Sequence, residues 1–198
     1  MEPAMPNLLR VHSPIPVKLA EVRLNKVIMN VVGLVLTIAL CAAAVGVAWL
    51  LPHHAPVSDR DMTLMLLGFV VLVPFHEALH ALAAIRWGGV TFKENIRFGV
   101  LWSALTPYCH CNVPISIKAY RRVALLPLWI TGGIAVLALF VFPSFGLAIL
   151  TGVTLAACVG DVWIYWKLRC FPADVLVQDH RSEVGCDIFQ GGIPAPVA

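Results

Sequence analysis

Two histidines and a glutamate stand close together in residues 74–82, which read PFHEALHAL. Residues four apart lie on one face of a helix, so His76 and His80 can direct imidazole nitrogens at one metal ion. Neutral imidazole suits zinc, and zinc makes a bound water acidic enough to yield hydroxide near neutral pH. Glu77 could take up and return the proton of that water. The spacing therefore predicts a zinc-dependent hydrolytic site with Glu77 as acid/base.

A catalytic zinc ion takes three protein ligands and leaves one position open, so a third ligand must come from elsewhere in the chain. The longer pattern HExxHxxGxxH is absent, because Ala83 and Arg86 occupy the places of its Gly and last His. Two carboxylates are candidates: Glu94 in a polar loop, and Asp161 within the apolar stretch ACVGDVWIYW. We favour Asp161, because a carboxylate inside an apolar helix needs a partner.

Each of these groups also has an explanation without metal. The residues of the HExxH segment could form a polar cluster bonded to neighbouring helices, and Asp161 could pair with Arg121 or Lys167. However, an ionisable residue in a membrane span costs about 3 kcal/mol on insertion scales. Three such residues within five positions are hard to explain as passive packing, so a metal site is the better hypothesis.

The composition is that of an integral membrane protein. Of 198 residues, 60% are hydrophobic and 13% are charged, and the mean hydropathy is +0.85, whereas about a quarter of the residues of a soluble domain are charged. The net charge is only +3. The basic residues lie beside apolar stretches and do not form one long stripe, so we expect no nucleic-acid partner.

Four stretches are long and apolar enough to cross a bilayer as helices, which takes about 20 residues each. They cover residues 27–51, 63–87, 123–142 and 145–166. We therefore expect an all-α membrane protein with about four transmembrane helices. Residues 27–170 would form one membrane domain between a cytoplasmic N-terminal segment, residues 1–26, and a cytoplasmic C-terminal tail, residues 171–198.

The basic residues also predict the orientation, because short cytoplasmic loops collect Lys and Arg. They gather before the first span, between the second and third spans and after the fourth, and only Arg60 falls in the other connections. Both termini are therefore predicted to be cytoplasmic. Four of the six cysteines would face that reducing side and two would lie within spans, so we expect no disulfide framework.

The connection between the second and third spans, residues 88–122, is expected to contain a short β-hairpin. Its central part is rich in β-branched and aromatic residues and is interrupted by turn-forming residues. After it, Ser116 is expected to cap the third helix. Tyr120, Arg121 and Arg122 are expected to anchor that helix at the lipid headgroups.

The predicted ligands lie at matching depths. His80 stands seven residues before Trp87 at the inner end of its span, roughly 10 Å along the helix axis. Asp161 stands five residues before Trp166, roughly 8 Å by the same rise. Both spans run towards the cytoplasm in the predicted topology. We therefore expect a catalytic centre in the cytoplasmic half of the membrane, reached by water from that side.

The segment HEALHALAAIRWGG, followed about 80 residues later by VGD in another span, resembles the intramembrane zinc metalloproteases of the site-2 protease type. The longer run through YCHCNVPISIKAYRRVALLP, GDVWIYWKL and VQDHRSEVGCDIF is similar to the "putative zincin peptidase" family of small integral membrane proteins, over approximately residues 20–190. The resemblance implies that His76, His80 and Asp161 bind zinc and that Glu77 is the catalytic acid/base. The site-2 protease pattern NxxPxxxLDG is absent, and with it the Asn and Pro that bind substrate there.

Two further groups of polar residues are expected to be structural. In CHC, the cysteines at 109 and 111 would face one side of a strand and His110 the other, so we interpret the segment as a reduced interfacial loop. Asp179 and His180 in the tail are interpreted as a solvated structural pair. The sequence leaves open whether His110, Asp179 or His180 contributes to the site.

Small and polar residues within the spans are assigned to helix packing, where they let backbones approach closely. They are Asn30 in the first span and Thr131, Gly132 and Gly133 in the third.

The leading hypothesis is a membrane-embedded zinc metalloprotease that hydrolyses membrane-associated protein or peptide substrates. The alternative is a non-proteolytic membrane protein that uses the same metal site for binding, assembly or regulation. A metal transporter is disfavoured, because no chain of polar residues continues from the site across the outer half of the membrane. The presence of Glu77 favours an enzyme, since a structural site needs no base beside its first ligand.

Overall fold

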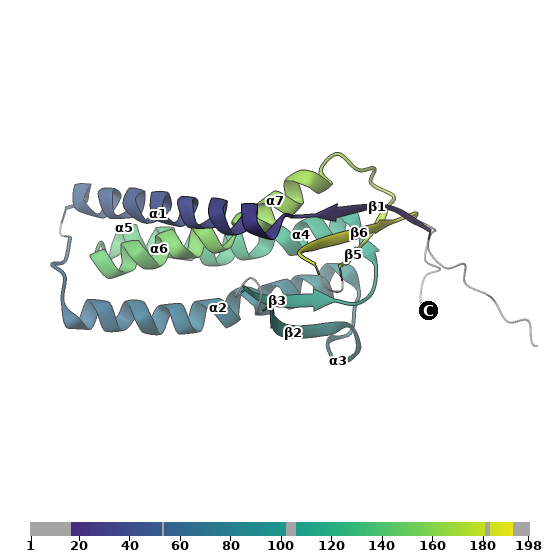
Figure 1. The fold of residues 1–198 in the computed structure, drawn as a ribbon. Coiled ribbons are helices and arrows are strands. Elements are labelled where there is room, and N and C mark those ends of the chain that lie inside the picture. The colour runs from purple at the N-terminus through teal and green to yellow at the C-terminus, as the bar shows by residue number, and fades with distance from the viewer. Residues whose placement is uncertain (1–16, 53, 102–105, 181–182, 192–198) are drawn as a thin grey trace, which may run out of the picture.

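The computed structural model describes residues 17–52, 54–101, 106–180 and 183–191. The chain is mostly helical, with its long helices side by side and two small antiparallel sheets gathered at one end of the helical bundle (Figure 1). The arrangement therefore has a helical membrane part and a mixed part at one end.

The four predicted spans are confirmed as helices long and apolar enough to cross a membrane. The first is α1 (Lys26–Leu50) and the second is α2 (Asp59–Gly88). The third joins α4 (Ile117–Pro127), the π-helical turn η1 (Leu128–Gly132) and α5 (Gly133–Val141). The fourth joins α6 (Phe145–Ala157) and α7 (Val159–Leu168).

Two spans begin earlier than the apolar pattern predicts, because polar residues cap them. Helix α2 starts at Asp59, before the predicted Thr63, and its N-cap is Ser58. The third span starts before its apolar run, with Ser116 as the predicted N-cap, and the Ser116 hydroxyl accepts a hydrogen bond of 3.2 Å from the Ala119 amide. A capping side chain satisfies amides that a helix start leaves free, so it extends a helix into polar sequence.

The predicted hairpin is also confirmed. Strand β2 (Ile96–Leu101) pairs antiparallel with β3 (Thr106–Cys111), and the one-turn helix α3 (Phe92–Asn95) precedes it. Strand β3 packs against α2. The hairpin therefore lies beside the helix that carries the HExxH residues.

A second sheet was not predicted, so the expectation of an all-α protein with one hairpin is incomplete. Its antiparallel strands follow the order β1 (Lys18–Arg23), β6 (Gly185–Phe189), β5 (Leu176–Asp179) and β4 (Ile115–Ser116). The predicted N-terminal segment and C-terminal tail thus pair with each other. Strands this short, with partners so distant in sequence, leave only a weak periodic signal.

This four-stranded sheet shares a hydrophobic core with the ends of the third and fourth spans. Ile117 of α4, Leu168 of α7, and Val177 and Ile188 of the sheet are completely buried in one cluster. Burial of such side chains contributes about 1.5–3 kcal/mol each. The sheet is therefore fixed to the helices and does not form a loose tail.

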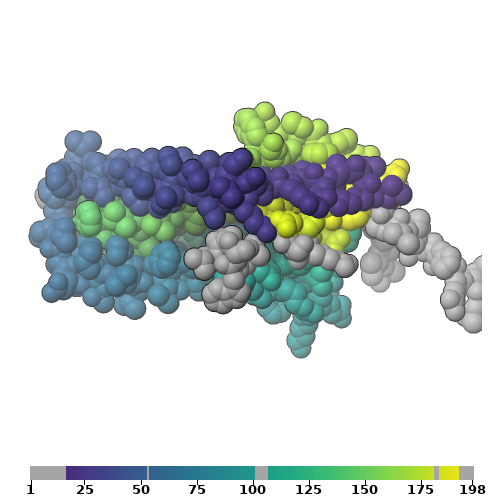
Figure 2. Space-filling model, viewed as in Figure 1, coloured from purple at the N-terminus to yellow at the C-terminus, as the bar shows by residue number. Residues whose placement is uncertain are grey.

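The membrane part is held together by close contact of α1 with α6. Figure 2 shows α1 and α2 along the two long edges of one face, with α6 visible between them. A Cβ atom built on Gly152 of α6 would lie 2.5 Å from the Cα atom of Cys41 in α1. Only glycine lets the two backbones come so close, as is common between membrane helices.

The residues assigned to helix packing have different surroundings. Thr131 and Gly132 are buried, and Gly132 lies against Leu155 of α6. Gly133 is exposed. Asn30 is also exposed, and it lies on the wall of the cavity that holds the HExxH residues. The expectation that Asn30 packs between helices is therefore wrong.

Substituting valine for Gly152 should force α1 away from α6 and lower stability by about 1–3 kcal/mol, the usual range for overpacking. The measurement is thermal unfolding in detergent. Gly46→Val is the matched control, because a Cβ at Gly46 of α1 meets nothing within 4 Å. Equal unfolding temperatures for the two variants would contradict the packing argument.

Candidate metal centre

Helix α2 presents both histidines of the HExxH segment on one face. The Nε2 atoms of His76 and His80 are 3.3 Å apart, and their rings are nearly perpendicular, with centroids 5.0 Å apart. Each side chain is 12% exposed. The helical spacing therefore brings two imidazole nitrogens to one point that is largely screened from solvent.

The fourth span brings a carboxylate to the same point. Asp161, in the first turn of α7, places Oδ2 3.2 Å from His76 Nε2 and Oδ1 3.5 Å from His80 Nε2. Bonds of about 2.0–2.1 Å to a tetrahedral zinc ion separate neighbouring donors by about 3.3–3.4 Å. The three side chains predicted as ligands therefore have the mutual spacing of one face of a zinc tetrahedron.

The helix that carries Asp161 is broken just before it. Helix α6 ends at Ala157, and the Cys158 amide turns back to the carbonyl groups of Leu155 and Ala156. Helix α7 then begins at Val159. The break gives Asp161 a position in a new first turn, so its direction is not fixed by the register of α6.

A backbone carbonyl orients His80. The ring atom Nδ1 lies 2.9 Å from the Val123 oxygen of α4. A carbonyl can only accept, so Nδ1 carries the proton and the neutral ring has a bare lone pair at Nε2. Such a bond at the far ring nitrogen is what fixes the tautomer of metal-binding histidines.

That carbonyl is available because of a proline. In a regular α-helix the Val123 oxygen would accept from the amide of residue 127, but Pro127 has no N–H. The helix passes into the π-helical turn η1 directly afterwards, and the Thr131 hydroxyl donates to the Pro127 oxygen at 2.7 Å. Pro127 thus leaves a carbonyl of α4 free to bind His80.

The donor set fits a metal ion better than it fits a hydrogen-bonded cluster. Asp161 Oδ2 is buried and accepts no hydrogen bond from the residues that the structure describes. It faces His76, and the bare lone pair of His80 points to the same place. Acceptors that converge in this way repel one another unless a cation lies between them. Two imidazoles and a carboxylate are a ligand set found in zinc enzymes.

Glu77 stands beside this donor set and not within it. It lines, with the two histidines and Asp161, a cavity of about 560 Å³ whose walls come from α1, α2, β3, α4, α6, α7, β5 and β6. The backbone amide of Cys109 in β3 faces its carboxyl group. The arrangement leaves a carboxylate next to a metal-binding position in a cavity large enough for a substrate segment.

The structure distinguishes between the two candidates for the third ligand, Glu94 and Asp161. Glu94 lies on α3, exposed, with Oε2 3.4 Å from the Thr91 hydroxyl, and it is not part of the cavity wall. Arg121, the alternative partner of Asp161, donates instead to the carbonyl oxygens of Leu168 and Phe171 at 2.7 and 3.2 Å. Asp161 is therefore the carboxylate that the fold brings to the histidines.

Cys158 also lies at the site, which the sequence did not indicate. Its Sγ atom is within 4.8 Å of the ligand atoms of His76 and Asp161, and its thiol donates to the Thr154 oxygen at 3.4 Å. A cysteine in an apolar stretch looks like ordinary core. Only the helix break places it beside the carboxylate.

The CHC segment lies on β3, as predicted for a strand. Cys111 is buried in the core cluster and Cys109 packs against that cluster, while His110 lines the cavity. Burial raises the pKa of the Cys109 thiol to about 12 and also raises the pKa of Cys111. Both remain neutral thiols near neutral pH, which agrees with their interpretation as structural residues.

His180 belongs to a charged cluster on the four-stranded sheet. Its Nε2 atom is 3.2 Å from Glu21 Oε1, and the ligand atoms of Glu21, His180 and Asp187 gather within 4.8 Å. Lys18 is 2.7 Å from Asp187 and 3.0 Å from Glu21, and Arg23 also pairs with Glu21. The two cations neutralise the carboxylates, so the cluster joins β1 to β6 as an ion-pair network.

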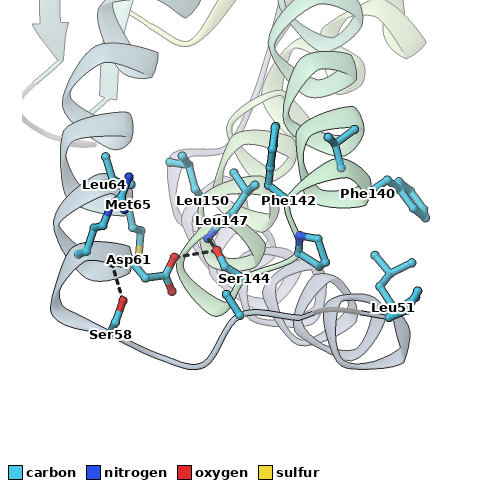
Figure 3. A pocket seen from close by; sticks show the side chains of 15 residues that line it. Leu51, Ser58, Asp61, Leu64, Met65, Phe140, Phe142, Ser144, Leu147 and Leu150 are labelled. Atoms are coloured by element: carbon cyan, nitrogen blue, oxygen red, sulfur yellow. Dashed lines mark hydrogen bonds between the residues drawn. The ribbon is translucent and has the colours of Figure 1, made fainter.

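A larger cavity, about 830 Å³, lies at the opposite end of the bundle (Figure 3). Its carboxylate, Asp61, accepts hydrogen bonds of 2.7 Å from the Ser144 hydroxyl and from the Gly146 amide, and so fixes the start of α6. The described lining contains no histidine or cysteine. The smaller cavity is therefore the candidate functional site.

Comparison with known proteins agrees with this location. Residues 69–176 match the family described as putative zincin peptidase, and this range contains all four predicted site residues. An uncharacterized 24.7 kDa protein in the gap 5' region of Pyrococcus woesei is 29% identical over an alignment of 137 residues that covers 63% of this chain and 55% of that protein. The chain thus spans about half the length of this curated relative. No solved structure matches the chain.

The ligand assignment predicts different metal contents for two carboxylate variants. Asp161→Ala should lose the zinc that the wild type binds, because a donor of the triangle is missing, whereas Glu94→Ala should keep it. Metal per chain is measured by mass spectrometry after purification in detergent. Zinc retained by Asp161→Ala and lost by Glu94→Ala would reverse the assignment.

The role of Pro127 predicts a loss of zinc affinity without a loss of stability. In Pro127→Ala the new amide competes with His80 for the Val123 oxygen, so zinc affinity should fall about 10-fold, the low end for loss of a ligand's hydrogen-bond partner. The unfolding temperature should not fall, because the helix gains a hydrogen bond. Zinc titration of Pro127→Ala beside Pro143→Ala, at the far end of the bundle, measures this. Equal affinities would contradict it.

Proposed function

The chain belongs to the putative zincin peptidase family, and from this membership we propose that it is a membrane-embedded zinc metalloprotease acting on membrane-associated proteins or peptides. The proposal goes beyond the family in three respects: the identity of the ligands, the role of Glu77 and the location of the site within the membrane. Each respect is supported by a separate feature of the site.

The observation that carries the proposal is the convergence of His76, His80 and Asp161 beside an acid that is not part of the donor triangle. The donor atoms of these three side chains lie 3.2–3.5 Å apart and can bind one zinc ion together. Three protein ligands leave one position of a tetrahedron open, as catalytic zinc sites require. A closed structural site would need a fourth protein ligand and no adjacent base, and the Cys158 thiol beside the site donates instead to the Thr154 oxygen. The geometry with Glu77 in the same cavity therefore favours hydrolysis.

A zinc ion bound there supplies Lewis-acid polarisation of the substrate carbonyl and acidifies a water molecule. Glu77 accepts a proton from the attacking water and returns it to the nitrogen of the leaving amine, so that the peptide C–N bond breaks as a new C–O bond forms. The Cys109 amide faces the Glu77 carboxyl group on the hairpin side of the cavity. His80 keeps its tautomer through Val123.

The likeness to the site-2 protease type supports placement within the membrane. It consists of an HExxH segment in one span and a distant aspartate in another, which is the arrangement of α2 and α7 here. Gly160 precedes Asp161, in place of the reverse order in that group. The residues that bind substrate must therefore differ, and Asn30 on the α1 wall of the cavity is a polar side chain in position to do so.

We also propose that both termini face the cytoplasm. The support is the distribution of basic residues, which gather in the N-terminal segment, the connection between the second and third spans and the C-terminal tail. The same orientation puts both sheets, and the parts of the cavity wall that they supply, on the cytoplasmic side, where water is available for hydrolysis.

The acid/base role is tested with Glu77→Gln. The variant should keep zinc, since Glu77 is not a ligand, but should cleave at least about 100-fold more slowly, as expected for loss of a general base. Zinc per chain and hydrolysis of β-casein and of a single-span membrane protein are measured together in detergent. Cleavage at the wild-type rate would refute the role. A wild type that binds zinc but cleaves neither probe would favour the non-proteolytic alternative.

A further inference from the structure

We infer that Asp179 is a positioning residue of this site, because its carboxylate holds together the two elements that place Glu77 and His80. The inference rests on the proposed function and adds a residue to it. Asp179 is the last residue of β5 and lies outside residues 69–176, the part of the chain that matches the family.

The two carboxylate oxygens of Asp179 bind two different elements. Oδ2 accepts a hydrogen bond of 2.7 Å from the Cys111 amide of β3, and Oδ1 accepts one of 2.5 Å from the Tyr120 hydroxyl of α4. Along the chain, Asp179 is 59 positions from Tyr120 and 68 positions from Cys111. One side chain of the sheet therefore connects the hairpin to a membrane helix.

On the hairpin side, Asp179 and Glu77 bind the same edge of one strand. Amides two residues apart in a strand point to the same edge, and the Cys109 amide faces Glu77 while the Cys111 amide binds Asp179. The edge of β3 that faces the cavity thus meets both carboxylates, and the Asp179 bond fixes it two residues from the amide that faces Glu77. Strand β3 would stay paired with β2, but loss of the Asp179 bond would loosen its cavity-facing edge next to Glu77.

On the helix side, Asp179 acts on the group that orients His80. Tyr120 is 7% exposed, so its hydroxyl has little access to water and depends on Asp179 for a hydrogen bond. Val123, whose oxygen binds His80 Nδ1, lies three residues later, on the same face of α4. A shift of Tyr120 would therefore move the carbonyl that orients a predicted ligand.

The sheet makes Asp179 a firm attachment point. Strand β5 lies between β6 and β4, and Asp179 is opposite Cys186, which is completely buried. The next residue, His180, donates its amide to the Gly185 oxygen at 3.0 Å. The backbone of Asp179 is thus fixed from outside the membrane, and its carboxylate transmits that position to the site.

The test compares Asp179→Asn with Asp187→Asn, the same change on the neighbouring strand β6, where the side chain pairs with Lys18. An asparagine amide keeps one acceptor oxygen and puts an NH2 group where the second donor met a carboxylate oxygen. Tyr120→Phe is the second variant, since it removes one of the two bonds and leaves the carboxylate. The full chain in detergent is titrated with Co²⁺, whose visible absorption reports ligand geometry, and kcat and KM are measured on β-casein.

Asp179→Asn should change the Co²⁺ spectrum and lower kcat about 10–100-fold with little change in KM, the usual effect of losing a group that orients a ligand. Tyr120→Phe should change the Co²⁺ spectrum and kcat in the same direction as Asp179→Asn, but to a smaller extent. Asp187→Asn should behave as wild type. Wild-type spectra and kcat for both Asp179→Asn and Tyr120→Phe would overturn the inference, even if their unfolding temperatures fell. If Asp179→Asn does not fold, Tyr120→Phe alone decides in the same way.

The proposed function can fail separately. If the wild type binds Co²⁺ but does not cleave casein, the proteolytic role is not supported, and the spectra alone decide the role of Asp179. A changed spectrum in Asp179→Asn beside an unchanged one in Asp187→Asn then supports positioning at a metal site without protease activity. Unchanged spectra in both overturn it.

Discussion

The approach of Asp161 to the two histidines is the constraint on which the rest of the structure depends. The side chains of His76, His80 and Asp161 meet between α2 and α7, with separations of 3.2–3.5 Å, on two of the helices that are apolar enough to cross a membrane. In an apolar environment such a meeting is unfavourable unless a cation satisfies all three. The polar residues of α2 and α7 are therefore best understood together, as one site shared by two spans.

Irregular backbone occurs where this site needs it. The absence of an amide at Pro127 frees the carbonyl that orients His80, and the helix break at Cys158 lets α7 present Asp161. Within a membrane, free backbone groups are tolerated where they line a cavity or find another partner. Both departures meet that condition, so they belong to the construction of the site and are not defects of the spans.

The sequence predicted the parts of the structure that follow from local pattern. The four spans follow from length and hydropathy, the pair His76 and His80 from helical spacing, and Asp161 from its depth in an apolar stretch. The four-stranded sheet could not be predicted, since β1 and β6 are short and meet only after the chain has crossed the membrane part. Cys158 and the Tyr120–Asp179 bond were missed for a similar reason. A buried thiol or tyrosine has no periodic signature, and its partner is set by tertiary packing.

The unpredicted sheet has the greatest consequence for the site. Strand β1 is followed by α1 after Asn25, whose side chain caps the helix, β4 passes directly into α4 at Ser116, and the chain after α7 returns to β5. Three of the four spans are thus joined to one sheet at the same end of the bundle (Figure 1). Membrane helices in lipid lack a strong hydrophobic force that fixes their relative height. A sheet hydrogen-bonded across their ends supplies that register for α1, α4 and α7, and α2 is placed by its packing against α4. A site divided between α2 and α7 needs such a register, because a shift of one residue along a helix would move a ligand by about 1.5 Å.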